Sequence, residues 1–537
     1  MNANFDPLVY PYPSRRSMVF SRRGMVATSQ PLAAQAGLEI MKKGGNAVDA
    51  AIAAASCLTV VEPTSNGIGG DAFALVWSGG KLWGLNSSGP APQKLSLEAL
   101  TGAGHKWVPH HGVSPVTVPG APACWAELSR KFGRLPLKDC LNSAIEYAEA
   151  GFPVSPVVSE LWSEAFKTYK AQRGEEFQHW FETFAPLGRA PAAGETVCLP
   201  HHAATLAAIA ETNAEVFYRG NISEKIGAFF QKHSGYLTAD DLAAFKPEWV
   251  EPVKVNYRGY DVWEIPPNGQ GIVALMALNI LRGFEFEDRE TIKTYHRQIE
   301  AVKLAFADGL RYIADIRRMK VRVPDLLADS YAAERRKLIG EQAVNPFPGE
   351  PHRGGTVYLA AADGDGNMVS FIQSNFEGFG SGMVVPGTGI ALHNRGVCFL
   401  LAPGHDNCLE PGKKPYHTII PGFLTKDGEP IGPFGVMGGF IQPQGHVMVV
   451  SNIVDFHMNP QAALDAPRFR CVGDRTVEVE AHFPRHIAEA MGRIGHDVKY
   501  GAVADLGFGR GQIIWRDKDG VLGGGSDPRA DGQVAAW

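Results

Sequence analysis

The chain has 537 residues, of which 45% are hydrophobic and 20% charged, an ordinary globular composition that excludes disordered and collagen-like proteins. Its 51 basic and 56 acidic side chains give a net charge of −5 without any basic block, so nucleic acids and anionic membranes are not expected partners. The length allows about three or four domains of ordinary size. The 61 glycines indicate many tight turns and close backbone approaches.

The seven cysteines are scattered and form no CxxC pair, which favours buried, reduced thiols over a disulfide framework or a zinc knuckle. The first 20 residues contain no continuous apolar stretch of the kind found in secretory leaders. The longest apolar run, at residues 50–61, is too short to span a bilayer. The sequence therefore predicts a cytoplasmic protein without a membrane segment.

The first part of the chain predicts a strand, two helices and a second strand, in that order. Ser29 is expected to cap the first helix, and Gly44 and Gly45 to end it. A cluster of glycines precedes the second strand. The expected ranges are 25–29 for the first strand, up to 41 and 46–59 for the helices, and 72–77 for the second strand.

Residues 120–320 have mostly helical patterning, interrupted near 257–271. Within this part, residues 291–317 predict a long amphipathic helix, because apolar side chains recur at helical spacing. The pattern changes at residues 335–355, which are charged, rich in proline and glycine, and predict no regular structure.

A hairpin is predicted directly after this segment. Residues 356–362 and 368–374 read as strands, and the turn DGDGN at 363–367 joins them. The last third of the chain is rich in strands and glycine turns. Helices first and a hairpin later predict a layered α/β protein rather than a βαβ array.

Short signatures of several common chemistries are absent from the sequence. It contains no P-loop, HExxH or GxSxG motif, and its glycine clusters do not match the dinucleotide-binding spacing. His105, His110 and His111 lie in a loop-like segment without a cysteine or carboxylate at ligand spacing, which favours surface histidines over a metal site. Neither a metal nor another cofactor is expected.

A nucleophile that needs no distant partner remains as a candidate. A threonine at the start of a chain carries its own base, because the freed α-amine can take the Oγ proton. Such a residue is made by cutting the chain, and the expected pattern is a Gly/Pro-rich segment running into a strand that begins with threonine. The segment Gly354-Gly355-Thr356-Val357 has this form. Gly-Thr before an ordinary strand has the same local pattern.

Motifs spread over nearly the whole chain point to one family. The chain resembles the gamma-glutamyltranspeptidases, or glutathione hydrolases, and their cytosolic acylase-like and oxamate-amidohydrolase-like relatives in the N-terminal-nucleophile (Ntn) hydrolase superfamily. The motifs that carry the resemblance are GGNAVDAA (44–51), VVEP (60–63), GIGGDAF (67–73), YRGYDVWEIPPNGQG (257–271), EAVKLAFADGLRYIAD (300–315), DGDGNMVSFIQSNFEGFGSG (363–382), PGKKPYHTIIP (411–421), GGFIQPQG (438–445) and GGGSDPRADG (523–532).

The resemblance implies a four-layer αββα sandwich and a proenzyme that is cut between Gly355 and Thr356. The products would be a large subunit, residues 1–355, and a small subunit, residues 356–537, folded together as one intertwined domain. Thr356 Oγ would first attack the Gly355 carbonyl and then, in the cut protein, a substrate amide, giving an acyl-enzyme. Water would complete hydrolysis, or an amine acceptor could take the acyl group.

Further site residues follow from the same resemblance. Gly438 and Gly439 match the family's oxyanion-hole glycines, whose backbone N–H groups face developing negative charge. Ser374 falls where the family has a second threonine that supports the nucleophile, and Asn375 offers a further polar contact. From local sequence alone, the glycine pair is an equally good tight turn and Ser374 an ordinary buried hydrogen-bonding residue.

The residues expected to bind a γ-glutamyl head group depart from the family pattern. Ser88 stands where the family has the arginine that grips the α-carboxylate, and Cys398 stands where it has the aspartate that pairs with the ammonium. His417-Thr418 replace a pair of serines. An ion left without its partner in a dry site loses several kcal/mol, so ordinary glutathione is not the expected substrate.

Arg395 and His417 are gained near the lost anchors. Arg395 could hold a different carboxylate, with His417, Thr418 and Asn375 as further substrate contacts, or it could pair with a neighbouring acid. The sequence predicts a self-processing amidohydrolase for a γ-glutamyl or related small acyl amide. The alternative is an oxamate amidohydrolase or a glutaryl- or cephalosporin-type acylase with little activity on glutathione.

The retained Thr356, Ser374 and glycine pair argue against a non-catalytic binding protein. The expected partners are a small amide substrate, water or an amine acceptor, and the chain's own two subunits. A homo-oligomer is also compatible with the sequence.

Overall fold

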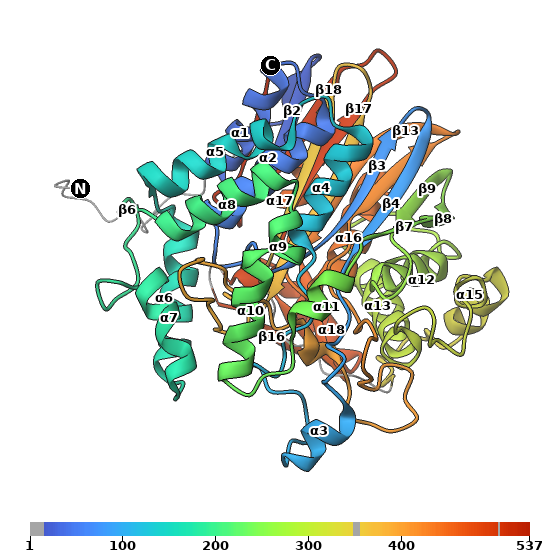
Figure 1. Cartoon of the computed structure of the whole chain (residues 1–537). Helices are drawn as coiled ribbons and strands as arrows, with labels where there is room; N and C mark the ends of the chain where they lie inside the picture. The colour runs from blue at the N-terminus through green and yellow to red at the C-terminus, as the bar shows by residue number, and fades with distance from the viewer. Residues whose placement is uncertain (1–15, 347–354, 503–504) are drawn as a thin grey trace.

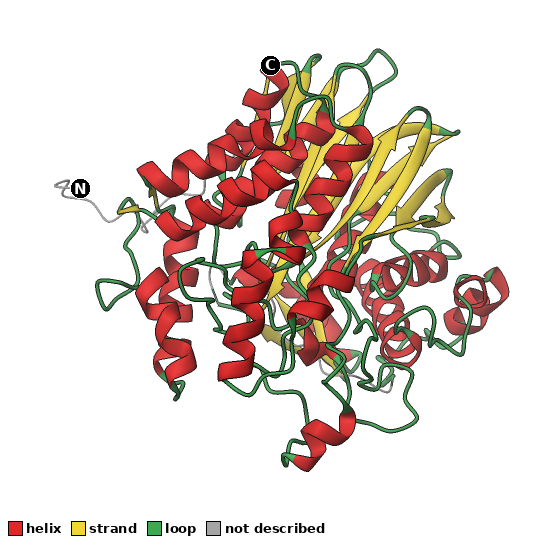
Figure 2. Ribbon diagram, in the orientation of Figure 1, coloured by secondary structure: helices red, strands yellow, loops and turns green. Residues whose placement is uncertain are grey.

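The computed structural model describes residues 16–346, 355–502 and 505–537. Strands gather in the centre of the molecule between two groups of helices (Figure 2). Two seven-stranded sheets, in which all neighbouring strands are antiparallel, pack against each other. The αββα sandwich expected from the sequence is confirmed.

The first sheet has the predicted hairpin at its centre. The hairpin strands are β10 (Gly355–Asp363) and β11 (Met368–Phe376), and they pair in antiparallel register. The order of the sheet is β19 (Gln533–Ala536), β2 (Gly24–Thr28), β10, β11, β3 (Asp71–Ser78), β4 (Lys81–Ser87) and β7 (Glu248–Val250).

The second sheet packs on the first through small residues. Gly435 lies against the Tyr358 ring of β10, where a Cβ would come within 2.4 Å of a ring carbon. The order is β1 (Val19–Ser21), β18 (Leu522–Ser526), β17 (Arg510–Arg516), β13 (Glu429–Met437), β12 (Gly422–Lys426), β9 (Tyr260–Glu264) and β8 (Val253–Tyr257). Both sheets thus combine strands from before and after Thr356.

Helices cover the outer face of each sheet (Figure 1). The helices on the first sheet and beyond it are α1 (Pro31–Lys42), α2 (Ala47–Val61), α4 (Ala121–Phe132), α5 (Leu137–Ala150) and α8 (Pro200–Thr212). Those on the second sheet and beyond it are α12 (Gly271–Leu281), α13 (Ile292–Tyr312), α15 (Asp329–Arg336), α16 (Ile441–Val454), α17 (Pro460–Asp465) and α18 (Arg485–Arg493).

Shorter elements complete the described chain. The remaining helices are α3 (Leu97–Gly102), α6 (Pro156–Lys170), α7 (Gln178–Phe184), α9 (Glu215–Arg219), α10 (Asn221–Lys232), α11 (Ala239–Ala244) and α14 (Val323–Leu326), with 3-10 turns η1 (Glu175–Phe177), η2 (Arg395–Cys398) and η3 (Leu506–Phe508). The remaining strands are β5 (Phe152–Pro153), β6 (Thr196–Val197), β14 (Phe469–Gly473), β15 (Thr476–Val479) and β16 (Asp497–Tyr500).

Three local expectations need correction. The N-cap of α1 is Gln30, whose side chain accepts the first free N–H groups of the helix, while Ser29 donates its hydroxyl to Glu62. The long helix α13 ends at Tyr312 rather than at residue 317, because Ile313 already has an extended backbone. The segment expected to lack structure begins inside α15, and its residues 347–354, including Gly354, lie outside the described residues.

All seven cysteines are free, and five of them are buried. Over the described part of the chain, no helix combines the length and the apolar character needed to cross a membrane. The longest apolar run of the sequence, residues 50–61, lies in helix α2, every residue of which is buried.

Candidate active site

Thr356 lies near the start of β10 and is fully buried. Its Oγ1 is 3.1 Å from the Oγ of Ser374 in β11, within hydrogen-bond distance. The register of the two strands shifts between Gly355 and Val357. Bulges of this kind re-aim a side chain, and this one sets Thr356 opposite the Ser374 hydroxyl.

The Ser374 hydroxyl is held by the backbone that follows it. Its oxygen accepts the N–H of Phe376 at 2.8 Å. Phe376 has a φ of 72°, a left-handed conformation that a bulky residue rarely adopts. This bend turns the end of β11 back toward its own side chain. The serine oxygen is therefore fixed in place while a proton can still pass between the two hydroxyls.

Asn375 occupies a different environment from Ser374. Its side chain lies against Gly67 and Gly70, where an added Cβ would come within 2.9 Å of the amide atoms. It is fully buried, and neither amide atom has a hydrogen-bond partner among the described residues. The glycine cluster before β3 thus makes room for the Asn375 amide.

Gly438 and Gly439 directly follow β13, a strand that packs on β10, and lie just before α16. Their φ values of 133° and 72° lie in the region that favours glycine. Gln270 holds this turn, because its Nε2 donates to the Gly439 carbonyl at 3.0 Å and to the Thr418 carbonyl at 2.6 Å. Tyr416 donates its hydroxyl to Gln270 Oε1 at 3.0 Å. The glycine turn is therefore fixed by a fully bonded side-chain amide.

A cluster of buried charges lies on the strand beside Ser374. Asp71 of β3 pairs with Ser374 across the sheet. Its carboxylate accepts Arg395 Nε at 2.8 Å and Nη2 at 3.1 Å, together with His417 Nε2 at 2.8 Å. Arg395 Nη1 donates to Thr418 Oγ1 at 2.7 Å, and all these side chains are fully buried. Of the two alternatives for Arg395, the structure contains the ion pair with a neighbouring acid.

The surroundings fix the protonation of this cluster. Burial alone would raise the pKa of Asp71, but Arg395, His417 and His393 together hold it well below its usual range. Burial, reinforced by the charge of Arg395, lowers the pKa of His417 to about 4. At neutral pH the Asp71 carboxylate and the Arg395 guanidinium therefore balance each other, while His417 is neutral.

The positions of the two missing family anchors hold neutral groups. The Ser88 hydroxyl donates to Asn86 Oδ1 at 2.8 Å and is fully buried. Cys398 ends the short turn η2, and burial raises the pKa of its thiol to about 12. A neutral thiol beside Arg395 offers nothing to balance an ammonium ion.

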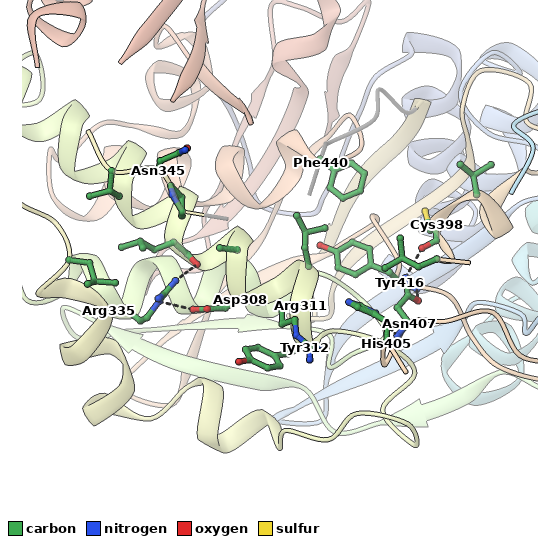
Figure 3. A pocket seen from close by; sticks show the side chains of 18 of the residues that line it. Asp308, Arg311, Tyr312, Arg335, Asn345, Cys398, His405, Asn407, Tyr416 and Phe440 are labelled. Atoms are coloured by element: carbon green, nitrogen blue, oxygen red, sulfur yellow. Dashed lines mark hydrogen bonds and ion pairs between the residues drawn. The ribbon is translucent and has the colours of Figure 1, made fainter. Parts of the chain in front are cut away.

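Two cavities meet at Phe440, directly after the glycine turn. The first, which we call the Arg311 cavity, has a volume of about 830 Å³ and is shown in Figure 3. Its lining includes Leu304, Asp308, Leu310, Arg311, Tyr312, Arg335, Phe376, Cys398, His405, Asn407, Tyr416 and Phe440. The second, the Glu377 cavity, has a volume of about 740 Å³ and includes Thr64, His110, Glu164, Glu377, Gly438, Phe440, Arg470, Glu478, Asp505 and Arg510.

Within the described residues, one group of side chains has metal-ligand spacing. His296, Glu300 and His496 place their ligand atoms within 4.8 Å of one another. However, the Lys303 ammonium lies 2.8 Å from Glu300 Oε1, and His296 Nδ1 is bonded to His496 Nε2 at 2.9 Å. A buried cation at the carboxylate opposes a second cation, so this group fits a hydrogen-bond network better than a metal site.

Asp71, His393 and Gln270 were not predicted as site residues from the sequence. A signal for Asp71 was present, because it is a carboxylate at the start of an otherwise apolar strand and a buried charge needs a partner. No local pattern identifies Gln270, since its partners Thr418, Gly439 and Tyr416 are far away in sequence.

The fold and the site define an Ntn hydrolase, with a threonine near the start of a central strand in an αββα sandwich. A model of the gamma-glutamyltranspeptidase family matches residues 33–537. The glutathione hydrolase-like YwrD proenzyme of Bacillus subtilis is 36% identical over 96% of this chain and 98% of its own length. The oxamate amidohydrolase proenzyme of Klebsiella pneumoniae is 33% identical over 96% of this chain and 99% of its own.

Among solved structures, a cephalosporin acylase from Bacillus halodurans superposes with a TM-score of 0.97. It is 61% identical, with coverage of 100% of this chain and 99% of its own. The chain belongs to the gamma-glutamyltranspeptidase family. It is an amide-bond hydrolase of this family's type, as the sequence predicted.

Proposed function

We propose that the chain cuts itself between Gly355 and Thr356 and then uses Thr356 as the nucleophile of an acylase. The observation that carries this proposal is the buried contact of 3.1 Å between Thr356 Oγ1 and Ser374 Oγ at a bulge in the central hairpin. A hydroxyl in this position has a second hydroxyl to direct its proton. The proenzyme character of the relatives supports the same proposal.

Self-processing would begin with attack of Thr356 Oγ on the Gly355 carbonyl carbon. The new C–O bond replaces the C–N bond, and the hydroxyl proton moves to the nitrogen that becomes the Thr356 amine. Water then opens the ester, which leaves a carboxylate on Gly355 and restores the Thr356 hydroxyl. The two products, residues 1–355 and 356–537, would stay together because both sheets use strands from each.

Turnover would repeat this chemistry on a substrate amide. The free Thr356 amine takes the Oγ proton as the oxygen attacks, and returns it to the departing amine. The N–H groups of Gly438 and Gly439 would bind the developing oxyanion, and one such donor is worth about 3 kcal/mol of transition-state stabilisation. Hydrolysis of the acyl-enzyme by water, or its transfer to an amine acceptor, completes the cycle.

The acyl group would not be a γ-glutamyl group. Its ammonium ion requires a negative partner, while Cys398 is a neutral thiol and the Asp71 carboxylate is occupied by Arg395 and His417. Arg395, His417 and Thr418 would therefore shape the site from behind its wall, without direct contact to the substrate.

A glutaryl- or cephalosporin-type acylase is the best-supported activity, because 61% identity over the whole chain joins it to a cephalosporin acylase. Oxamate hydrolysis is the second candidate, supported by 33% identity to an oxamate amidohydrolase. The cytoplasmic location and the oligomeric state remain predictions.

The test of self-processing is a denaturing gel of purified protein with N-terminal sequencing of the fragments. Wild-type protein should give two fragments, the smaller of which begins at Thr356. Thr356→Ala should remain one chain and hydrolyse no amide, whereas Thr356→Ser, which keeps a hydroxyl, should still be cut. A wild-type chain that stays intact over days of incubation would contradict the proposal.

Substrate class is tested with 4-nitroanilides of glutaric acid and of γ-glutamate, together with ammonia release from oxamate. We expect the glutaryl anilide to be cleaved with the highest kcat/KM. Preferred cleavage of the γ-glutamyl anilide would show that the buried Asp71 cluster does not exclude an ammonium ion.

A further inference from the structure

The two cavities that meet at Phe440 differ in charge. The Arg311 cavity has one carboxylate, Asp308, and two guanidinium groups in its lining. The Glu377 cavity has four carboxylates and two guanidinium groups. With histidines neutral, the first cavity therefore has a net charge of plus one and the second of minus two. A substrate with unlike ends would be oriented by this difference.

The excess charge of the first cavity belongs to Arg311. Arg335 is paired with Asp308 at 2.9 Å and also donates to the Leu304 carbonyl at 3.2 Å. Arg311, at the last turn of α13, is exposed and has no carboxylate within ion-pair distance among the described residues. In Figure 3 it lies between the Asp308–Arg335 pair and the group of His405, Asn407 and Tyr416.

His405 provides a second donor beside Arg311. Its Nδ1 accepts the backbone N–H of Asn407 at 3.0 Å, so the proton of the neutral ring is on Nε2. Burial, and then the charge of Arg311, lower the pKa of His405 below its usual value. The ring is therefore neutral at physiological pH and can donate a hydrogen bond without adding a competing charge.

The rest of the lining suits a short hydrocarbon chain. Leu304 and Leu310 of α13 and the Tyr416 ring line the same cavity. Phe376, whose N–H binds the Ser374 hydroxyl, and Phe440, which follows the glycine turn, connect this wall with the reacting hydroxyls. A chain that enters past these two rings meets apolar walls and Arg311, which has no ion-pair partner among the described residues.

We propose that Arg311 receives the distal carboxylate of the acyl group, so that the preferred substrates are monoamides of dicarboxylic acids with a methylene spacer. The leaving amine then lies in the acid-lined Glu377 cavity, where an ammonium product is attracted rather than repelled. This inference rests on the proposed acylase function and names the substrate class of that site.

The experiment compares two chromogenic substrates that differ in the distal carboxylate, glutaryl-4-nitroanilide and butyryl-4-nitroanilide. Arg311→Gln should raise KM for the glutaryl substrate by about 10- to 100-fold, the range for loss of a hydrogen bond to a charged group. The butyryl substrate should be unaffected. Arg311→Lys, which keeps the charge but not the planar fork, should fall between.

Lys293→Gln is the matched control, because it removes one exposed positive charge from the other end of the same helix. It should change neither substrate. An equal loss for both substrates in Arg311→Gln would indicate a structural role at the end of α13, and an unchanged glutaryl KM would remove Arg311 from recognition. Either result overturns the proposal.

Failure of this inference can be told apart from failure of the proposed function. A processed enzyme that cleaves both anilides equally well contradicts only the role of Arg311. An uncut chain that cleaves no amide contradicts the proposed function. In that case calorimetry with glutarate still decides the inference, because wild type should bind it about 10- to 100-fold more tightly than Arg311→Gln.

Discussion

Asp71 and the Thr356–Ser374 pair lie on neighbouring strands of one sheet, but their polar groups are paired in different ways. Asp71 contacts Arg395 Nε and Nη2, His417 Nε2 and, at 3.2 Å, His393 Nδ1, and Arg395 makes a further bond to Thr418. The two hydroxyls are neutral and lie 3.1 Å apart, and Ser374 Oγ also accepts the Phe376 N–H. The first group consists of buried charges paired with one another, whereas the second consists of neutral hydroxyls between which a proton can move.

The two groups therefore have different roles, because the Asp71 cluster supports the structure and the hydroxyl pair serves the proposed chemistry. Charges taken fully out of water are stable only when they are completely paired, and a paired group has no capacity left for a ligand. The cluster therefore supports the strands on which the hydroxyls lie. The proposed recognition of the substrate instead uses Arg311, which lines a cavity and has no ion-pair partner among the described residues.

Breaking the Asp71 cluster should have the largest effect. Asp71→Asn leaves the Arg395 guanidinium buried without its counter-charge, so the free energy of unfolding should fall by about 3–5 kcal/mol. Denaturant unfolding measures the change. Asp365→Asn is the control, because it breaks an exposed ion pair with Arg134 and should lose at most about 1 kcal/mol. Equal losses in the two variants would show that Asp71 is not a supporting charge.

The stability of the protein should depend on pH through His417. The pKa of His417 is about 4 in the folded protein, whereas an exposed histidine has a value near 6.5. Between these values the unfolded chain binds a proton that the folded chain does not, so stability is complete above about pH 6.5 and falls as pH decreases toward 4. The loss attributable to His417 is about 3 kcal/mol.

Urea unfolding at pH 7.5 and pH 4.5 measures this dependence. His417→Gln should show a smaller loss between the two pH values than wild type. His486→Gln removes an exposed histidine of α18 and should leave the wild-type difference unchanged. A wild-type slope in His417→Gln would mean that His417 is not kept neutral by folding.

Much of the fold could be predicted because its signals are local. The hairpin of β10 and β11 has strand-forming residues on both sides of a DGDGN turn. Both strands lie close to their predicted ranges. The start of α1 was misassigned, because Ser29 is a typical cap residue but its hydroxyl has a buried carboxylate, Glu62, as a better partner. That competition depends on tertiary structure and leaves no local mark.

Site residues that belong to a sequence motif could be predicted, whereas those defined only by a contact between distant segments could not. Thr356 and Ser374 were found from the family motifs, and the structure places them together. The partner of Arg395 could not be assigned, because Asp71 lies 324 residues earlier in the chain. Arg311 lies within one of the family motifs, but its proposed role in binding depends on a cavity whose other walls come from distant segments.

The smallest effect is expected for a change in the Thr356–Ser374 hydroxyl pair. Ser374→Ala removes one hydroxyl partner of Thr356 and the acceptor of the Phe376 N–H, while the Asp71 cluster keeps all its bonds. We expect kcat and the rate of self-processing to fall about fivefold, since one neutral hydrogen bond contributes about 1 kcal/mol. Thermal unfolding should shift no more than in a variant that loses an equivalent buried hydrogen bond, because Ser374 Oγ also accepts the Phe376 N–H. Rates of processing and hydrolysis, measured beside a melting curve, distinguish the two.

Ser370→Ala is the matched control on the same strand. Ser370 lies four residues before Ser374, is fully buried, and bonds the Tyr358 hydroxyl at 2.8 Å rather than the nucleophile. This variant should lose a similar hydrogen bond and retain its activity. If both serine variants lose activity equally, the hydroxyl beside Thr356 acts only through packing. If Ser374→Ala alone slows the chemistry, the Ser374 hydroxyl acts on the reaction through its contact with Thr356.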